Sequence, residues 1–338
     1  MSLRTPASHV EPRGHTGHTW PRFGEFVGLV ARVPDTELEA CLAAQHARGG
    51  LLGQTLVDRW LLRPQQVDEI LGLQADWVAR SLHAEMAPGR FPYPACLSLC
   101  MPAYNEQETI AVTLRSALAI LPHYVERFEI VVVDDGSRDE TAARVAEASR
   151  HDPRVRLVRH ERNRGYGAAV TTALRAATGD LVMFADSDGQ FTFLDVARLL
   201  VKLGDADLVI GYRQHRADDP RRRLNAWLWG FLVRSVLGIR VRDLDCAFKL
   251  FRRETLERLR LTSSGACINA EILAQCLWGG LRFHEVAVTH YPRLAGKQTG
   301  ASLKVIAKAL RDLPALRKYR RQPLAPTSAP TPPRSNAA

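Results

Sequence analysis

Several well-known signatures are missing from this 338-residue chain. It has neither a GxGxxG fingerprint nor a GxxxxGK[ST] loop, which argues against a dinucleotide-binding fold and against a P-loop ATPase. None of its six cysteines forms a CxxC pair, so we expect reduced, buried thiols and neither a zinc site nor a disulfide framework. The polar N-terminus shows no secretory signal, and we therefore expect a cytoplasmic protein.

A long apolar run is also missing. The most apolar stretch, Leu224–Val233, covers ten residues between two arginines, whereas a membrane-spanning helix needs about 20. We therefore expect no membrane span. Trp227 and Trp229 beside the arginines suit a helix lying on a bilayer surface. A core helix of a soluble fold is the alternative.

Positive charge is in excess, with 46 Lys+Arg against 36 Asp+Glu and a net charge of +10. Such a balance favours an anionic partner: a nucleotide, a phospholipid surface or a nucleic acid. Much of the excess is local, in Arg221–Arg223 and in 317–321. No aromatic-basic RNA motif or recognition helix accompanies it, so we do not expect nucleic-acid binding.

Composition divides the chain into five segments. We expect a polar disordered tail at 1–19, a small mainly helical domain at 20–80, a Pro/Gly-rich linker at 81–95 and an α/β domain at 96–316. A basic and then Pro-rich tail follows at 317–338.

The helical segment contains an internal repeat. Residues 22–45 and 51–74 are two 24-residue copies separated by "HARGG". Each copy has a glycine, a short apolar run and a helical pattern, which indicates one supersecondary unit used twice. Equivalent positions lie 29 residues apart: Phe23/Leu52, Gly24/Gly53, Val27/Leu56, Leu38/Val67, Leu42/Leu71 and Gln45/Gln74.

This repeat resembles the MshEN-type cyclic-di-GMP-binding domain of type II secretion and pilus-assembly ATPases. The resemblance implies that five residues contact the dinucleotide: Arg22, Gly24, Gln45, Gly53 and Gln74. The second copy departs from the family pattern, with Leu51 in place of an arginine and Trp60 in place of a turn glycine. A helical docking module that binds no nucleotide is the alternative.

From Leu97 onward, apolar strands alternate with amphipathic helices. Strands are expected at 97–101, 129–135, 155–160 and 180–188, with helices from about Glu106 and within 137–148 and 165–177. Strands that are apolar throughout, each followed by a helix, predict a mostly parallel sheet covered on both faces. Such sheets bind ligands at the carboxyl ends of their strands. Here those ends carry "PAYNE", "DDGS", "NRGYG" and "DSDGQ".

The acidic pair in "FADSDGQ" suggests a metal site. Asp186 and Asp188 follow an apolar strand directly. Like charges this close repel one another, so the pair either faces water or holds a cation between its members. Oxygen ligands of this kind favour Mg²⁺ or Mn²⁺.

Seven motifs in order resemble the family 2 glycosyltransferases (GT-A fold), in the branch of dolichol- and polyprenyl-phosphate mannose synthases. They are "MPAYNEQETI", "VVVDDGSRDET", "NRGYGAAV", "DSDGQF", "VIGYR", "RDLDCAFKLFRR" and "HYPRLAGKQTGAS". The resemblance covers roughly residues 97–313. It implies an inverting, metal-dependent transfer of a sugar from a UDP- or GDP-sugar to an acceptor, most simply a polyprenyl phosphate at the membrane surface.

The same resemblance implies roles for individual residues. Donor binding falls to Pro102, Tyr104, Glu106, Asp134, Asp135, Arg164, Gly165, Asp186 and Arg213. Asp186 and Asp188 would hold the metal, and the catalytic set is Asp188, Gln190 and Asp245. Arg293 and Lys297 would neutralise diphosphate or acceptor phosphate, because such cations suit phosphate recognition.

The acceptor decides the role of the "DLD" aspartates. A hydroxyl acceptor needs a carboxylate base, and Asp245 or Asp243 lies where such a base is expected. A phosphate acceptor is already anionic and needs little or no base. The basic clusters and the Trp-bearing helix favour a lipid phosphate at an anionic membrane, with the protein peripheral to the inner face of the cell membrane. A cyclic-di-GMP sensor or docking protein with a secondary transferase domain is the alternative.

Overall fold

The computed structural model describes residues 23–31, 33–48, 52–82, 91–214, 220–291, 293, 311–321 and 324. Four helices come first: α1 (Phe23–Val30), α2 (Asp35–Arg48), α3 (Leu52–Asp58) and α4 (Pro64–Leu82). The strands are β1 (Tyr93–Ala103), β2 (Val125–Asp134), β3 (Val155–Arg159), β4 (Leu181–Phe184), β5 (Leu208–Arg213), β6 (Lys249–Arg252) and β7 (Phe283–Val288).

Helices and short 3₁₀ turns connect these strands. The helices are α5 (Ile110–Ile120), α6 (Thr141–His151), α7 (Tyr166–Ala176), α8 (Val196–Leu203), α9 (Pro220–Leu237), α10 (Arg253–Glu257) and α11 (Ile268–Trp278). The 3₁₀ turns are η2 (Leu121–His123), η3 (Phe193–Asp195) and η4 (Leu313–Arg321).

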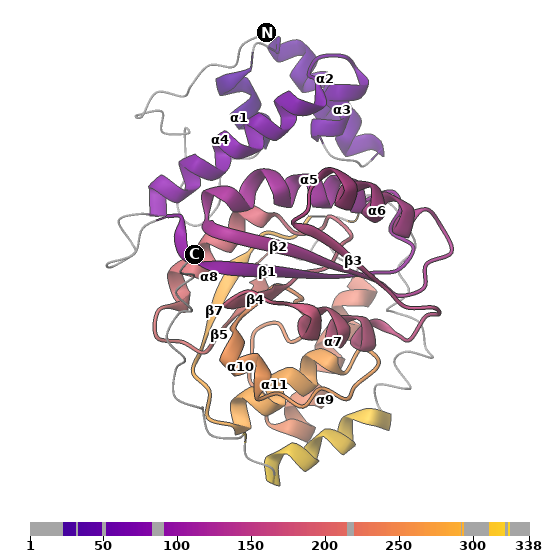
Figure 1. Cartoon of the computed structure of the whole chain (residues 1–338), viewed down its shortest axis with the longest axis vertical. Coiled ribbons are helices and arrows are strands. Elements are labelled where there is room, and N and C mark those ends of the chain that lie inside the picture. The colour runs from indigo at the N-terminus through magenta and orange to yellow at the C-terminus, as the bar shows by residue number, and fades with distance from the viewer. Residues whose placement is uncertain are drawn as a thin grey trace, which may run out of the picture.

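The seven strands form one sheet in the order β3-β2-β1-β4-β6-β5-β7. Strands β1 to β4 pair in parallel, as do β5 and β7, and only β6 runs antiparallel to its neighbours. Figure 1 shows α5 and α6 on one face of β1–β3 and α7 on the other. The expected α/β architecture, a mostly parallel sheet with helices on both faces behind a small helical unit, is confirmed.

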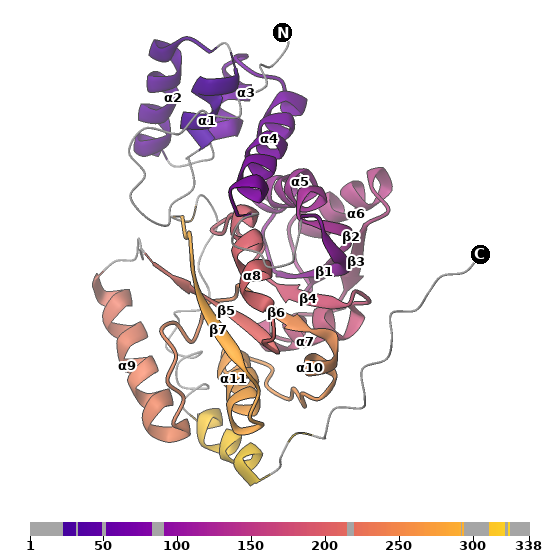
Figure 2. The same ribbon diagram turned by 90° about the vertical axis from the view of Figure 1, so that its left-hand side faces the viewer.

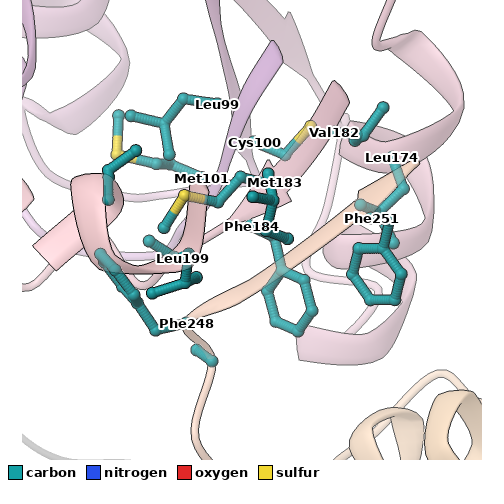
Figure 3. Packing of buried hydrophobic residues seen from close by; sticks show 14 of the residues in the cluster. Leu99, Cys100, Met101, Leu174, Val182, Met183, Phe184, Leu199, Phe248 and Phe251 are labelled. Carbon is teal, nitrogen blue, oxygen red and sulfur yellow. The ribbon is translucent and has the colours of Figure 1, made fainter. Parts of the chain in front are cut away.

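The largest core lies within and around this sheet. The central strands β1 and β4 contribute fully buried side chains such as Leu99, Met101 and Phe184. Figure 3 shows Phe184 and Phe251 side by side, and their rings stack with centroids 6.4 Å apart. The buried run of β4 continues to Ala185, directly before Asp186, so the acidic pair follows a packed core.

Some boundaries differ from those expected. Helix α5 begins at Ile110 and not near Glu106, because Asn105 has a positive φ of 56° and residues 107–109 form a turn. Strand β4 ends at Phe184, so the acidic pair stands in the loop after it. Tyr319, placed by composition in the C-terminal tail, lies in η4 and is buried, and its hydroxyl donates to Glu271 of α11 at 2.6 Å.

Helix α4 connects the two parts of the molecule. Its first half, with Ile70, belongs to the core of the N-terminal helices, whereas Ala75 and Val78 belong to the core of the sheet domain. Figure 2 shows α4 running from the α1–α3 group down to α5 and α8. The helix extends to Leu82 and β1 begins at Tyr93, so regular structure occupies both ends of the range 81–95 expected as a linker.

The two sequence copies pack on one another through equivalent positions. A Cβ on Gly24 would lie 3.0 Å from Leu52, and one on Gly53 would lie 3.6 Å from Phe23 and 2.8 Å from Val67. Phe23 and Leu52 occupy the same place in the two copies. The contact is therefore reciprocal, and the glycines allow α1 and α3 to approach each other closely.

We predict that Gly53→Ala destabilises the chain. The new methyl group would clash with Val67, and overpacking of this kind costs about 1–3 kcal/mol, more than the ~1 kcal/mol that alanine gains in a helix. Gly28→Ala is the matched control on α1, because its Cβ would meet only Leu38 at 3.8 Å. It should leave the stability unchanged or raise it. Denaturant midpoints of the two variants provide the measurement, and equal midpoints would contradict the prediction.

Asp68 of α4 faces α5 in an unfavourable environment. Its buried Oδ1 accepts no hydrogen bond within the described part of the chain, and Arg115 Nε of α5 stands 3.8 Å away. Burial raises the pKa of Asp68 to about 6, although Arg115 partly offsets it. Because the folded state holds this proton more tightly than the unfolded state, stability falls as pH rises from about 4 to 6.

Asp68→Asn removes this penalty. We expect the melting temperature to rise by about 1–3 °C at pH 7, and the gain to vanish towards pH 4, where the wild-type carboxyl is itself neutral. Glu39→Gln, which neutralises an exposed carboxylate of α2, serves as the control. Thermal melts across this pH range would contradict the prediction if the gain were the same at every pH.

Candidate active site

The acidic pair stands at the carboxyl end of β4, in the middle of the sheet. Ser187, between the two aspartates, is buried, and its hydroxyl donates to the Pro102 carbonyl of β1 at 2.8 Å. Asp186 accepts a hydrogen bond from the Tyr166 hydroxyl at 2.9 Å, and Asp188 accepts one from the backbone N–H of Gln190 at 3.1 Å. Since Ser187 anchors the loop to the sheet, both neighbouring carboxylates are held over the strand end.

The environment of this pair disfavours the ionised form of both aspartates. Burial raises the pKa of Asp186 to about 7, with repulsion from Asp188 as the next cause. Burial also raises the pKa of Asp188, against the influence of Arg293. Two buried carboxylates that repel one another fit a divalent cation, which would relieve both effects. In the described ranges, no three acidic, histidine or cysteine side chains are grouped so that they could hold a metal ion. A cation held by this pair would take its other ligands from substrate and water.

Arg293 lies beside the pair, within ion-pair distance of Asp188. Its guanidinium hydrogen-bonds Glu106, and its Nη1 is 3.7 Å from Asp188 Oδ2. Gln190 supports this position, because its side-chain amide donates to the Tyr291 carbonyl at 3.0 Å and its own carbonyl accepts from the Tyr291 N–H at 2.8 Å. The expected residues Glu106, Asp188, Gln190 and Arg293 are thus brought together.

The two aspartates at the carboxyl end of β2, Asp134 and Asp135, are engaged by other groups of the protein. Asp135 accepts hydrogen bonds from the backbone N–H groups of Arg164 and Gly165, at 2.9 and 2.8 Å, and contacts His160 Nδ1 at 2.6 Å. Asp134 is fully buried and accepts from the Ser137 N–H at 3.1 Å. These carboxylates organise the "DDGS" and "NRGYG" loops, and the Arg164 side chain itself is exposed.

Gly165 lets its own backbone and that of Ser264 approach each other closely. It has a φ of 100°, and a Cβ there would lie 2.4 Å from the Ser264 carbonyl oxygen. That same carbonyl accepts the N–H of Gly167 at 3.0 Å. The first amides of α7 are therefore partly satisfied by Ser264, while Tyr104 on the β1 loop stays half-buried at the same edge of the sheet.

Arg213 is engaged by Asp243. Its Nε and Nη2 donate to the two carboxylate oxygens at 2.6 and 2.8 Å, and both side chains are largely buried. Burial opposes the charge of Arg213, but the hydrogen bonds to Asp243 outweigh it and raise the pKa of the guanidinium. The structure thus gives Arg213 a partner that the sequence analysis did not assign to it.

Asp245 lies between this pair and α9. Its Oδ1 accepts a hydrogen bond from Trp229 Nε1 at 3.1 Å. Burial raises the pKa of Asp245, as does repulsion from Asp243, while Arg213 and Lys249 lower it. An aspartate with a raised pKa beside an acidic site has the properties of a proton acceptor.

Four side chains at this site were not singled out from the sequence: Tyr166, His160, Trp229 and Lys249. Tyr166 and Lys249 stand inside motifs that were recognised, "NRGYG" and "AFKLF". Trp229 was assigned only to a membrane-surface helix. Because its partner Asp245 is 16 positions away, no local pattern could have revealed the contact.

The structure describes only some of the residues predicted to contact cyclic-di-GMP. Arg22 and the departure at Leu51 lie outside the described residues, as does Lys297 of the phosphate set. Gly24 and Gly53 are buried between helices, Gln74 is 2% exposed, and Gln45 is half-buried. Trp60 has a φ of 60° and is 95% exposed in the turn after α3.

Two further expectations concern thiols and membranes. The six cysteines are free, and all but half-buried Cys96 are buried. Within the described part of the chain, every helix is too short or too polar to cross a bilayer.

Three curated relatives are similar to this chain in sequence. A dodecaprenyl-phosphate galacturonate synthase of Rhizobium johnstonii is 28% identical over 59% of this chain and 60% of its own length. An undecaprenyl-phosphate 4-deoxy-4-formamido-L-arabinose transferase of Pseudomonas fluorescens is 30% identical over 64% and 63%. A dolichyl-phosphate beta-glucosyltransferase of Dictyostelium discoideum is 32% identical over 48% and 56%. The chain spans about three fifths of the length of these curated relatives.

The fold is also that of solved structures. Glucosyl-3-phosphoglycerate synthase from Mycobacterium tuberculosis, in complex with UDP, superposes with a TM-score of 0.52 at 23% identity, covering 72% of this chain and 84% of that one. Its complex with Mn²⁺, UDP-glucose and phosphoglyceric acid gives a TM-score of 0.51 at 20% identity, covering 74% and 85%. Residues 98–260 match the profile of the family described as glycosyl transferase family 2. This segment is therefore similar to glycosyl transferase family 2 domains, and the sheet domain has the GT-A fold of these structures.

Proposed function

We propose that the chain transfers a sugar from a nucleotide diphosphate sugar, UDP- or GDP-linked, to a polyprenyl phosphate, using Mg²⁺ or Mn²⁺. The observation that carries this proposal is the pair Asp186 and Asp188, two mutually repelling carboxylates at the carboxyl end of β4. Support comes from relatives named for sugar transfer with dodecaprenyl, undecaprenyl and dolichyl phosphates, and from a structural neighbour solved with Mn²⁺ and UDP-glucose.

The residues take the following roles in this proposal. Asp186 and Asp188 hold the cation, with Tyr166 orienting the first. The cation, when bound, neutralises charge that develops on the departing nucleoside diphosphate. Arg293, next to Asp188, stabilises the same phosphates. Loops after β1 and β2, with Pro102, Tyr104 and the Asp134 and Asp135 framework, shape the nucleoside side of the site.

The reaction is a single displacement with inversion at the anomeric carbon. The bond between that carbon and the diphosphate oxygen breaks, while a bond to the acceptor oxygen forms, and the electron pair leaves with the nucleoside diphosphate. A phosphate acceptor enters as an anion and needs no base. A hydroxyl acceptor would give its proton to Asp245, whose pKa is raised by burial and by Asp243. This second chemistry is the alternative that the position of Asp245 supports.

The test is sugar transfer from a panel of labelled nucleotide sugars to polyprenyl phosphate, with Mg²⁺, Mn²⁺ or EDTA. An organic-extractable, metal-dependent product would establish the proposed function and identify the donor. Metal-dependent donor hydrolysis without lipid product would direct the search to hydroxyl acceptors. No turnover of any donor would overturn the proposal and favour a sensor or docking protein. Flotation with anionic vesicles tests the proposed location at the inner membrane surface.

For residues 23–82 we propose a second function, binding of cyclic-di-GMP that shifts the transferase domain between states. The reciprocal packing of the two copies favours it, because Gly24 and Gly53, two of the residues that the resemblance assigns to the dinucleotide, occupy equivalent places in this contact. Helix α4, which has side chains in both cores, supplies a physical connection between the parts. Calorimetry with high micromolar cyclic-di-GMP is the test, and the absence of heat and of any change in transfer rate would overturn this function.

A further inference from the structure

Lys249 is a lysine with no access to solvent, at 0% exposure. It opens β6 and pairs with Phe184 of β4 and Ile210 of β5, in the centre of the sheet. Its Nζ lies 5.4 Å from the centroid of the Phe184 ring. Burial lowers the pKa of Lys249. An ammonium group in such a place is unfavourable unless specific partners hold it, so its partners indicate what it does.

Those partners surround one residue. Nζ hydrogen-bonds the Cys246 carbonyl oxygen, approaches the Leu244 carbonyl oxygen at 3.4 Å and donates to Asn269 Oδ1 at 2.7 Å. Leu244 and Cys246 are the two neighbours of Asp245 in the chain. The ammonium group therefore holds the backbone on both sides of Asp245, while Asn269 of α11 holds the ammonium group.

The Asp245 side chain is held separately. Trp229 of α9 donates to its Oδ1, and the preceding Asp243 is clamped by Arg213. Neither of these contacts fixes the peptide groups that flank Asp245. In addition, the charge of Lys249 lowers the pKa of Asp245, so it favours the ionised form of that carboxylate.

We propose that Lys249 is a positioning residue for the acceptor side of the site, which sets the orientation of Asp245 through the carbonyl groups of Leu244 and Cys246. The inference deepens the proposed function, and its consequences for activity rest on that function. Its structural consequence, a changed environment for Asp245 and hence for Trp229 Nε1–H, does not.

The decisive variant is Lys249→Met, which keeps a long apolar chain and removes the donors and the charge. The indole N–H of Trp229, identified among the six tryptophans by its loss in Trp229→Phe, should shift or broaden in ¹⁵N spectra of ¹⁵N-tryptophan-labelled protein. The kcat for sugar transfer should fall about a hundredfold, because a slightly displaced Asp245 would no longer orient the acceptor, with the donor KM unchanged.

Lys249→Gln keeps an amide donor without the charge, and it remains informative if the methionine variant fails to fold. We expect a smaller indole shift and about a tenfold fall in kcat, intermediate between wild type and the methionine variant. Thr255→Val is the matched control, because Thr255 is equally buried beyond the other end of β6 and its hydroxyl donates to the Asp207 carbonyl. It should change neither the indole signal nor the kcat.

An unmoved Trp229 signal in folded Lys249 variants would overturn the inference, as would a kcat equal to that of wild type. If the protein turned over no donor at all, only the proposed function would be overturned. In that case the Trp229 signal still decides whether Lys249 positions Asp245.

Discussion

Asp188→Asn should reduce metal-dependent sugar transfer by about a thousandfold or more, which corresponds to about 4 kcal/mol of transition-state stabilisation. The asparagine keeps the shape of the side chain and its backbone hydrogen bond, yet removes one of the two charges that would hold the cation. The titration of free Mn²⁺ by its paramagnetic resonance signal should show weaker binding in the variant. This readout does not depend on the identity of donor or acceptor.

The same variant should be at least as stable as the wild-type protein. Asp188 raises the pKa of Asp186 by repulsion, and Glu106 still binds Arg293 in the variant. Loss of activity without loss of stability is expected where a protein keeps like charges together for function. Asp205→Asn is the control, because Asp205 is exposed and paired only at the surface with Arg282. If Asp188→Asn retained a tenth of the wild-type rate, the assignment of Asp188 as a metal ligand would be wrong.

The sheet domain could be predicted from sequence because its signals are local. Apolar strands that end in "DDGS" or "DSDGQ" place their polar residues at one edge of a parallel sheet, and Asp186, Asp188 and Glu106 do meet there. The antiparallel strand β6 had no such signal, since the chain reaches it through a long segment that contains α9.

Contacts between distant segments account for most of what the sequence did not reveal. Asp135 resembles a free ligand in "DDGS", but it is held by Gly165, 30 positions away. Lys249 resembles part of a surface basic cluster in "FKLFRR", but three acceptors on two segments hold it inside the sheet. In each case the sequence showed a charged residue at a motif, but it did not show which distant residue binds it.

Arg213 offers the largest expected effect on stability. Arg213→Met should destabilise the chain by about 3–5 kcal/mol, because it leaves the Asp243 carboxylate buried without its bidentate partner. Asp243→Leu should cost a similar amount by leaving the guanidinium unpaired. The double variant should recover most of the loss, since replacing a buried ion pair with apolar groups of similar size is often neutral. Denaturant unfolding of all four proteins provides the measurement.

This cycle also decides between two roles for Arg213. If the arginine acts mainly on donor phosphates, Arg213→Met would raise the donor KM and cost little stability, and the Asp243→Leu substitution would rescue nothing. If the arginine acts through Asp243, stability and kcat should fall together, because the carboxylate stands two residues before Asp245 and repels it. The close geometry, with donor to acceptor distances of 2.6 and 2.8 Å in a largely buried pair, favours the second outcome. Arg293 is then the one described arginine in contact with the acidic pair itself, and the donor-binding role predicted for Arg213 would not hold.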